Sequence, residues 1–147
     1  DAWELHGTIM EAEMAANLER EWDRGRDRLS EQLLAQLERG RKVLAIDYQR
    51  ALSRIAPIYG GFVELFEQRY DAILTPAATG AAPEGLSSTG DPVFCTLWTL
   101  CGMPAISLPL LQSASGLPLG IQLVGPRHGD GRLLRTARWL AARVAAG

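Results

Sequence analysis

Two serines, a histidine and an aspartate lie close together late in the sequence, at Ser107, Ser113, His128 and Asp130. These are the residue types of a serine hydrolase, in which histidine deprotonates the serine and a carboxylate orients the histidine. A nucleophilic serine usually sits on a strained turn beside glycines. Ser107 lies instead within the apolar run AISLPL, and Ser113 lies in a linker. The pattern therefore favours a surface turn for His128 over a local catalytic triad.

Other kinds of catalytic site have little support in the residue pattern. General acid–base catalysis needs two carboxyl groups held together in a cleft. Asp71 and Asp91 are the acids that adjoin apolar runs, and their positions favour a turn and a helix cap. The segment GLPLGIQLVG lacks the G-x-G-x-x-G spacing of a dinucleotide-binding loop. We therefore expect no cofactor.

The two cysteines, Cys95 and Cys101, are expected to be free thiols. Their separation of six residues directs them about 120° apart on one helix, which disfavours a disulfide. Neither has metal-ligand spacing with His6 or His128, so no metal site is expected. Unpaired thiols suit a reducing compartment, and the sequence accordingly predicts a cytoplasmic protein.

Composition indicates one globular domain. The 147 residues are 47% hydrophobic and 22% charged, with a formal net charge of -2. That charge creates no general field for nucleic acid or anionic lipid. No apolar run approaches the ~20 residues that cross a bilayer, and we expect no leader segment. The mixed-charge run at 19–28 and the arginines at 132–143 are typical of solvated helix faces.

Periodic apolar residues predict helices throughout residues 1–69. The first covers 3–22, after which DRGRDR interrupts the pattern. Ser30 is a favourable N-cap for the second helix, and Gly40 is placed to end it. A third helix, at about 45–69, carries an inward stripe of apolar side chains and contains Pro57, which should kink or split it because proline removes a backbone hydrogen bond.

Residues 70–147 alternate short strands with helices. Apolar runs predict strands at 72–75, 105–110 and 119–124, with an irregular loop at 77–90. A helix between Asp91 and Gly102 should have Phe94, Leu97, Trp98 and Cys101 on its inner face. A last helix from about Asp130 should bury Leu133, Leu134, Ala137, Leu140, Ala141 and Val144. This order predicts an α/β fold with the helices mostly first and the strands late.

Four segments in a fixed order carry a family resemblance. They are YDAILTP at 70–76, DPVF with LWTL at 91–100, GMPAISLPL at 102–110 and GLPLGIQLVG at 116–125. Together they resemble the carboxy-terminal region of the amidase signature family, serine hydrolases that cut carbon–nitrogen amide bonds. The resemblance implies that residues 1–147 are the carboxy-terminal part of one such domain, with a helical segment at 1–69 and a strand–helix segment at 70–147. It also implies that the strands belong to a large mixed sheet.

The resemblance also implies a catalytic Ser-Ser-Lys set, and no residue of this sequence matches it. Lys42, the only lysine, lies in ERGRKVLAIDY, which does not fit the family's base. We therefore expect no catalytic residue here and no activity from this chain alone, with the parent enzyme an amidase. Asp91, Phe94 and Trp98 are the candidates for substrate contact, with the loop at 77–90 setting substrate choice. Helix capping by Asp91 and core packing by Trp98 are the structural alternatives.

Two other functions stay open. The chain can be a non-catalytic association module or inactive remnant, or part of a transfer-RNA-dependent amidotransferase subunit of the same family. The expected partners are the missing amino-terminal half of the enzyme, a small amide substrate and a second copy of the chain. Open edges of the apolar strands favour such association. No direct contact with nucleic acid or membrane is expected.

Overall fold

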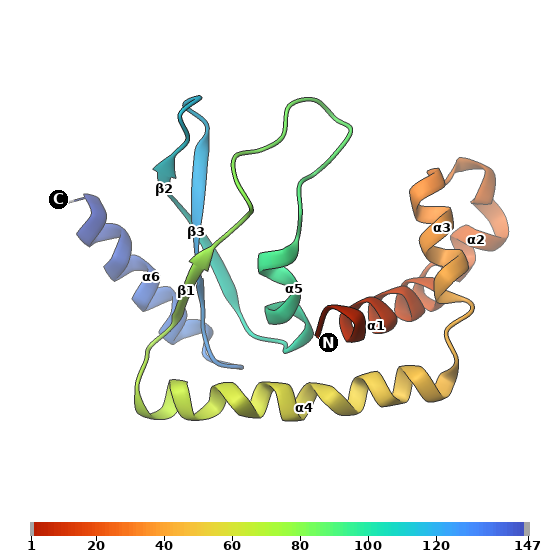
Figure 1. Ribbon diagram of the computed structural model, residues 1–147, viewed down its shortest axis with the longest axis horizontal. Coiled ribbons are helices and arrows are strands. Elements are labelled where there is room, and N and C mark those ends of the chain that lie inside the picture. Colours follow the sequence, from red (N-terminus) through yellow and green to blue (C-terminus); the bar gives the residue numbers. More distant parts are fainter. Residues whose placement is uncertain (1, 146–147) are drawn as a thin grey trace. The chain divides into compact units, whose positions relative to one another are not determined.

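A computed structural model describes residues 2–145 of the chain (Figure 1). Its elements are α1 (Ala2–Asn17), α2 (Glu19–Gly25), the 3-10 turn η1 (Arg26–Arg28), α3 (Glu31–Gly40), α4 (Ala45–Gln68), β1 (Ile73–Pro76), α5 (Val93–Leu100), β2 (Ala105–Gln112), β3 (Pro118–Val124) and α6 (Asp130–Ala145). The chain divides into two compact units, Asp1–Pro57 and Ile58–Gly147. None of the helices described is long and apolar enough to cross a membrane.

The first unit is helical, as predicted, but the first predicted helix forms as two separate helices. α1 ends at Asn17 and α2 begins at Glu19. Leu18 between them has φ -104° and ψ 22°, which lies outside helical values. Helical hydrogen bonding continues on both sides of Leu18, from Leu18 N–H to Met14 O and from Trp22 N–H to Leu18 O. The expectation of one helix over 3–22 is therefore wrong at this single irregular residue.

Helix α3 packs closely against α1. It begins after Ser30, whose hydroxyl accepts a hydrogen bond from Leu33 N–H at 3.3 Å, which confirms the predicted N-cap. It ends at Gly40, as predicted, but not through a left-handed glycine, because Gly40 is not among the residues with positive φ. A Cβ at Gly40 would overlap the carbonyl oxygen of Glu11. The glycine is required by the close approach of the two helices.

Helix α4 runs without a break from Ala45 to Gln68, with Pro57 inside it. The predicted split at Pro57 does not occur. The boundary between the two compact units nevertheless falls directly after this proline. In the second unit, Ile58, Tyr59, Phe62 and Phe66 of α4 pack into the core, as their spacing predicts.

The second unit is built on a three-stranded antiparallel sheet in the order β1-β3-β2. Figure 1 shows α6 along one face of this sheet and α5 on the other. The buried side chains of α6 are Leu133 and Ala137, which pack with Leu123 of β3. On the α5 face, Val124 of the same strand packs with Trp98. The central strand is therefore covered on both faces, as expected for a near-continuous apolar strand.

One expectation about burial is wrong. Leu134 and Val144 of α6 are 58% and 47% exposed, because α6 contacts the sheet through a narrow stripe of residues one turn apart. Strand β2 alternates exposed and half-buried positions. It forms one edge of the sheet, and β1 forms the other.

Replacement of Gly40 by alanine should destabilise the first unit by about 1–3 kcal/mol, because the added methyl group forces α1 and α3 apart. Gly61→Ala is the matched control. Gly61 is also helical, but a Cβ there would meet nothing within 4 Å, so alanine should stabilise by about 0.5–1 kcal/mol. Urea unfolding of both variants measures the difference. Equal effects would contradict the tight contact between α1 and α3.

Candidate functional site

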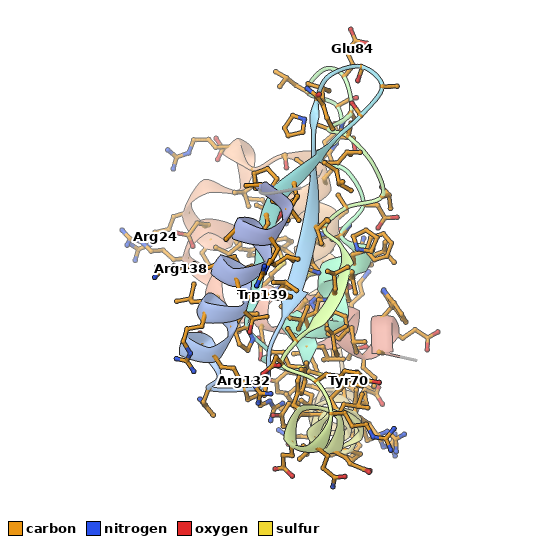
Figure 2. The ribbon with its side chains drawn as sticks, turned by 90° about the vertical axis from the view of Figure 1, so that its left-hand side faces the viewer. Arg24, Tyr70, Glu84, Arg132, Arg138 and Trp139 are labelled. Atoms are coloured by element: carbon orange, nitrogen blue, oxygen red, sulfur yellow. The ribbon has the colours of Figure 1, made fainter. Side chains whose placement is uncertain are left out.

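The long loop at 77–90 borders an open hollow together with Asp91 and Pro92, which directly precede α5. The hollow has a volume of about 610 Å³, and its lining includes Ala78, Pro83, Ser88, Thr89, Asp91 and Pro92. Figure 2 shows Glu84 at the far tip of this loop. The loop has no regular secondary structure, as predicted. One of the three sequence candidates, Asp91, therefore lies at a concave surface.

Asp91 binds the start of helix α5 with one carboxylate oxygen. Its Oδ1 accepts a hydrogen bond from Val93 N–H at 2.9 Å. The helix begins at Val93, and its first intrahelical bonds run from Cys95 N–H and Thr96 N–H to Pro92 O. Asp91 thus bonds the first N–H of the helix, but the N-cap itself is Pro92, one residue later than predicted. Asp91 is exposed, so its second oxygen remains accessible at the rim of the hollow.

A buried amide joins the two ends of this loop. Gln122 lies in the central strand β3 and is 5% exposed. Its Nε2 donates to Thr75 Oγ1 at 3.2 Å and to Phe94 O at 2.9 Å. Thr75 precedes the loop in β1, and Phe94 follows it in the first turn of α5. One side chain therefore fixes the distance between the strand that enters the loop and the helix that leaves it.

Further contacts hold the first residue of the loop. Ala77 N–H donates to Gly120 O at 3.0 Å. The thiol of Cys95 lies 3.8 Å from Ala77 O and 3.7 Å from Gln122 Oε1.

Cys95 and Cys101 are both free, as expected. Burial raises the pKa of the Cys101 thiol, and the charge of Arg127 offsets this in part, so Cys101 stays protonated and is a poor nucleophile.

Phe94 and Trp98 do not line the hollow. Phe94 is half-buried, and Trp98 is 9% exposed within the core of the second unit. The Trp98 ring packs edge-on against Phe62, with ring centroids 5.8 Å apart. Its indole Nε1 has no acceptor among the described residues. Trp98 is thus a core residue, and its contact with substrate remains a prediction.

The residues of the hypothetical triad are not brought together. Ser107 lies in β2 opposite Gln122, and Ser113 Oγ is 2.9 Å from Ser115 Oγ in the β2–β3 turn. His128 is exposed, with φ 60°, in the turn before α6. Within residues 2–145 no hydrogen bond joins either serine to His128. The sequence-based preference for a turn residue at His128 is confirmed.

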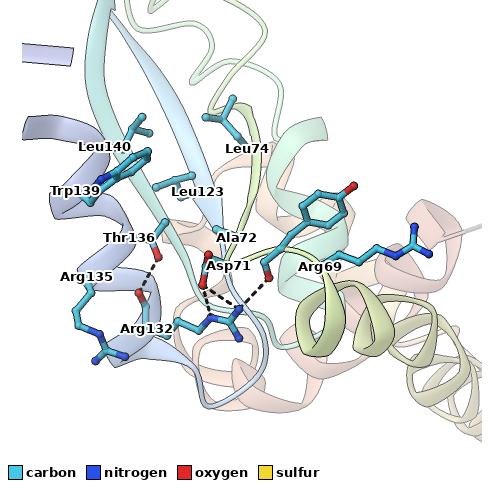
Figure 3. Close-up of a pocket in the computed structure, with 11 residues that line it drawn as sticks. Arg69, Asp71, Ala72, Leu74, Leu123, Arg132, Arg135, Thr136, Trp139 and Leu140 are labelled. Carbon is cyan, nitrogen blue, oxygen red and sulfur yellow. Dashed lines mark hydrogen bonds and ion pairs between the residues drawn. The ribbon is translucent and has the colours of Figure 1, made fainter. Parts of the chain in front are cut away.

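A second hollow, of about 710 Å³, lies between β1 and α6 (Figure 3). Arg132 of α6 donates to Asp71 Oδ1 at 3.1 Å, to Phe66 O at 3.1 Å and to Tyr70 O at 3.0 Å. Its guanidinium therefore holds the α4–β1 connection against α6. Asp71 takes part through this ion pair, whereas the sequence favoured a simple turn-forming role. Both partners are substantially exposed, so the pair adds little stability by itself.

Comparison with known proteins identifies the family. The Amidase family model matches residues 6–134. The chain belongs to the amidase signature family. It is 41% identical over 102 residues to the A subunit of glutamyl-tRNA(Gln) amidotransferase from Jannaschia sp. (strain CCS1), covering 65% of this chain and 21% of that protein. It is 36% identical over 92 residues to the corresponding mitochondrial protein of Mus musculus, covering 56% and 18%.

Solved structures of amidase signature enzymes share the fold. An amidase crystal structure matches with a TM-score of 0.82 at 24% identity, covering 97% of this chain and 35% of that one. A 6-aminohexanoate cyclic dimer hydrolase matches with a TM-score of 0.71 at 22% identity, covering 88% and 32%. The predicted α/β fold of this family is confirmed. The chain spans only about a fifth of the length of the curated relatives it matches.

Trp98→Ala should cost about 3–5 kcal/mol of stability, because it removes a large ring from a packed core. Trp139→Ala is the control, since Trp139 is 59% exposed and its loss should change stability by less than about 0.5 kcal/mol. Thermal and urea unfolding measure both. A Trp98→Ala chain as stable as the parent would show that this indole is not part of the core.

Gln122→Leu should loosen the loop at 77–90. The apolar side chain leaves the Phe94 carbonyl without its donor, at a cost of about 1–3 kcal/mol. Amide hydrogen exchange and limited proteolysis should both increase at 77–90 before global unfolding. Gln112→Leu is the control, because Gln112 is exposed and bonds only within its own turn, to Gly116 O. If the loop of Gln122→Leu is as well protected from hydrogen exchange and proteolysis as that of the parent, Gln122 does not hold the two ends of the loop together.

Proposed function

We propose that this chain supplies scaffold and part of the substrate cleft to an amide hydrolase of the amidase signature type. Its residues 1–147 would form the carboxy-terminal part of one such domain, with the catalytic Ser-Ser-Lys set contributed from outside them. Family membership and the fraction of each relative that is matched support this assignment. The observation that carries it is the hollow beside α5, whose loop is clamped at both ends by Gln122.

The proposed cleft surface starts at the rim of that hollow. Asp91 presents a carboxylate oxygen that can accept a hydrogen bond from an amide or ammonium N–H. Behind it, Phe94 provides apolar surface on the same helix. Trp98 has a buried indole N–H without an acceptor in the described residues, and a carbonyl oxygen of another segment or of a substrate would satisfy it. The loop at 77–90 would select the substrate by its shape.

In such an enzyme this chain would position substrate and leave bond cleavage to the serine set. The nucleophilic serine attacks the amide carbon, and backbone amides stabilise the oxyanion. A clamped loop keeps the substrate amide at a constant distance from that nucleophile, which lowers the entropic part of the barrier. Small amides are the proposed substrates. Free thiols are compatible with a cytoplasmic enzyme, and the rest of the enzyme is the proposed partner.

A second candidate is part of an amidotransferase subunit that takes ammonia from an amide donor for transfer-RNA-linked amidation. It is supported by the names of the relatives at 41% and 36% identity. Both candidates use the same hydrolysis of a carbon–nitrogen bond. They differ in whether ammonia is released or passed on to a glutamyl group. An inactive association module remains the third interpretation.

A hybrid enzyme tests the proposed cleft. In it, this chain replaces the matching segment of the Jannaschia protein, and the hybrid is assayed with simple amides and in transfer-RNA-linked amidation. We expect hydrolysis by the hybrid and no turnover by the chain alone. Asp91→Ala should raise KM about tenfold, because it removes a charged hydrogen-bond acceptor. Arg138→Ala, on the exposed side of α6, should leave KM unchanged.

The outcomes separate the candidate functions. Activity on simple amides alone favours a free amidase, and activity only in the coupled assay favours the amidotransferase. A folded hybrid without either activity would support the association module. Turnover by the isolated chain that disappears in Ser107→Ala or His128→Ala would overturn the proposal, because the chemistry would then reside within these residues.

A further inference from the structure

Three arginines gather around a hollow in the first unit. Arg20, Arg24 and Arg28 line a cavity of about 650 Å³ where α2 passes into η1, and Glu21, Gly25 and Leu29 complete its lining. All three arginines are exposed, as expected for a solvated helix face. The fold also places them around one concave surface. We propose that this hollow binds a phosphate group.

The local backbone explains why the three arginines lie around one hollow. Arg20 and Arg24 are four residues apart on α2, so their side chains lie one above the other. The helix ends at Gly25, and the chain turns into η1. A Cβ on Gly25 would lie 3.1 Å from Arg28 Nη2. The missing side chain therefore lets the Arg28 guanidinium fold back over the end of α2. Figure 2 shows Arg24 directed outward from the helices.

Arg20, Arg24 and Arg28 have no carboxylate partner among the described residues, as is also true of Arg41 and Arg54 in the same unit, whereas three other arginines of the unit are paired. Arg26 pairs with Glu38 at 2.9 Å, and Arg50 pairs with Asp47 at 3.3 Å. Arg39 pairs with Glu11 in the same way. Within residues 2–145, no ion pair involves an arginine of the hollow. Glu21 is the one acid in the lining, so three positive charges face one negative charge and the formal excess is +2.

The chemistry of guanidinium groups identifies the ligand class. Each guanidinium presents a planar fork of N–H donors that matches two oxygens of a phosphate. Cations held on one surface repel one another, and a bound dianion removes that repulsion. A phosphate monoester carries about -1.5 to -2 charges at neutral pH, which matches the excess of the lining. A carboxylate, with a single negative charge, would neutralise only half of the excess positive charge of the lining.

Titration of the 147-residue chain with inorganic phosphate tests the site. Calorimetry should give one binding site, and NMR shifts should be confined to the amides of residues 20–29. Arg24→Gln and Arg28→Gln should each raise Kd about tenfold, because each removes charge-assisted hydrogen bonds. Gly25→Ala should also raise Kd by displacing Arg28. Arg54→Gln is the matched control, since Arg54 is exposed, lies in the same unit and is outside the hollow.

Two further arms identify the source of the phosphate. Titration with glucose 6-phosphate represents a phosphate monoester, and titration with a short RNA hairpin represents a phosphodiester backbone. The site is supported if either probe binds more weakly to Arg24→Gln than to the parent chain while its affinity for Arg54→Gln is unchanged. The probe that binds more tightly identifies the source of the phosphate. The site is refuted if none of the three probes binds at millimolar concentration. It is equally refuted if Arg24→Gln and Arg28→Gln, folded by circular dichroism, bind as the parent does.

Discussion

The buried amide of Gln122 is the interaction on which the geometry of the second unit depends. It lies in the central strand, where an unpaired polar group would cost about 1–3 kcal/mol, and its Nε2 reaches both β1 and α5. The loop at 77–90 connects those two elements. An irregular segment of this length has many conformations, and a bridge at its base removes most of them. The hollow and the position of Asp91 are consequences of that bridge.

The two faces of the sheet are fixed by different kinds of contact. On the α5 face, Trp98 and Phe66 pack with Val124 in an apolar core. On the α6 face, the apolar stripe is narrow, and Arg132 adds three hydrogen bonds to the α4–β1 connection. The exposed Leu134 and Trp139 beside this stripe leave apolar surface on α6, a kind of surface that commonly marks contact with another protein segment.

The proposed function divides the second unit into a scaffold and a loop. Strands β2 and β3 and helices α5 and α6 would supply the scaffold, and the loop at 77–90 would supply the shape that a substrate meets. Loops placed by a rigid scaffold commonly carry specificity for this reason. In the first unit, the segment that contains Arg20, Arg24 and Arg28 connects α1 to α3, and the tight contact at Gly40 holds those two helices together.

The sequence by itself determined most helices and strands, the Ser30 cap and the family, because periodicity, capping and motif order are local properties. It also favoured the core position of Trp98. The roles of Gly40 and Gln122 were decided only by tertiary structure, since each depends on a residue 29 to 47 positions away in the chain. In the sequence, Gln122 is a polar residue in an apolar strand and belongs to the GLPLGIQLVG motif, but neither property reveals its hydrogen-bond partners. The exposure of Leu134 and Val144 was also decided by tertiary structure. Only a narrow stripe of α6 contacts the sheet, and the apolar type of these two residues does not reveal that.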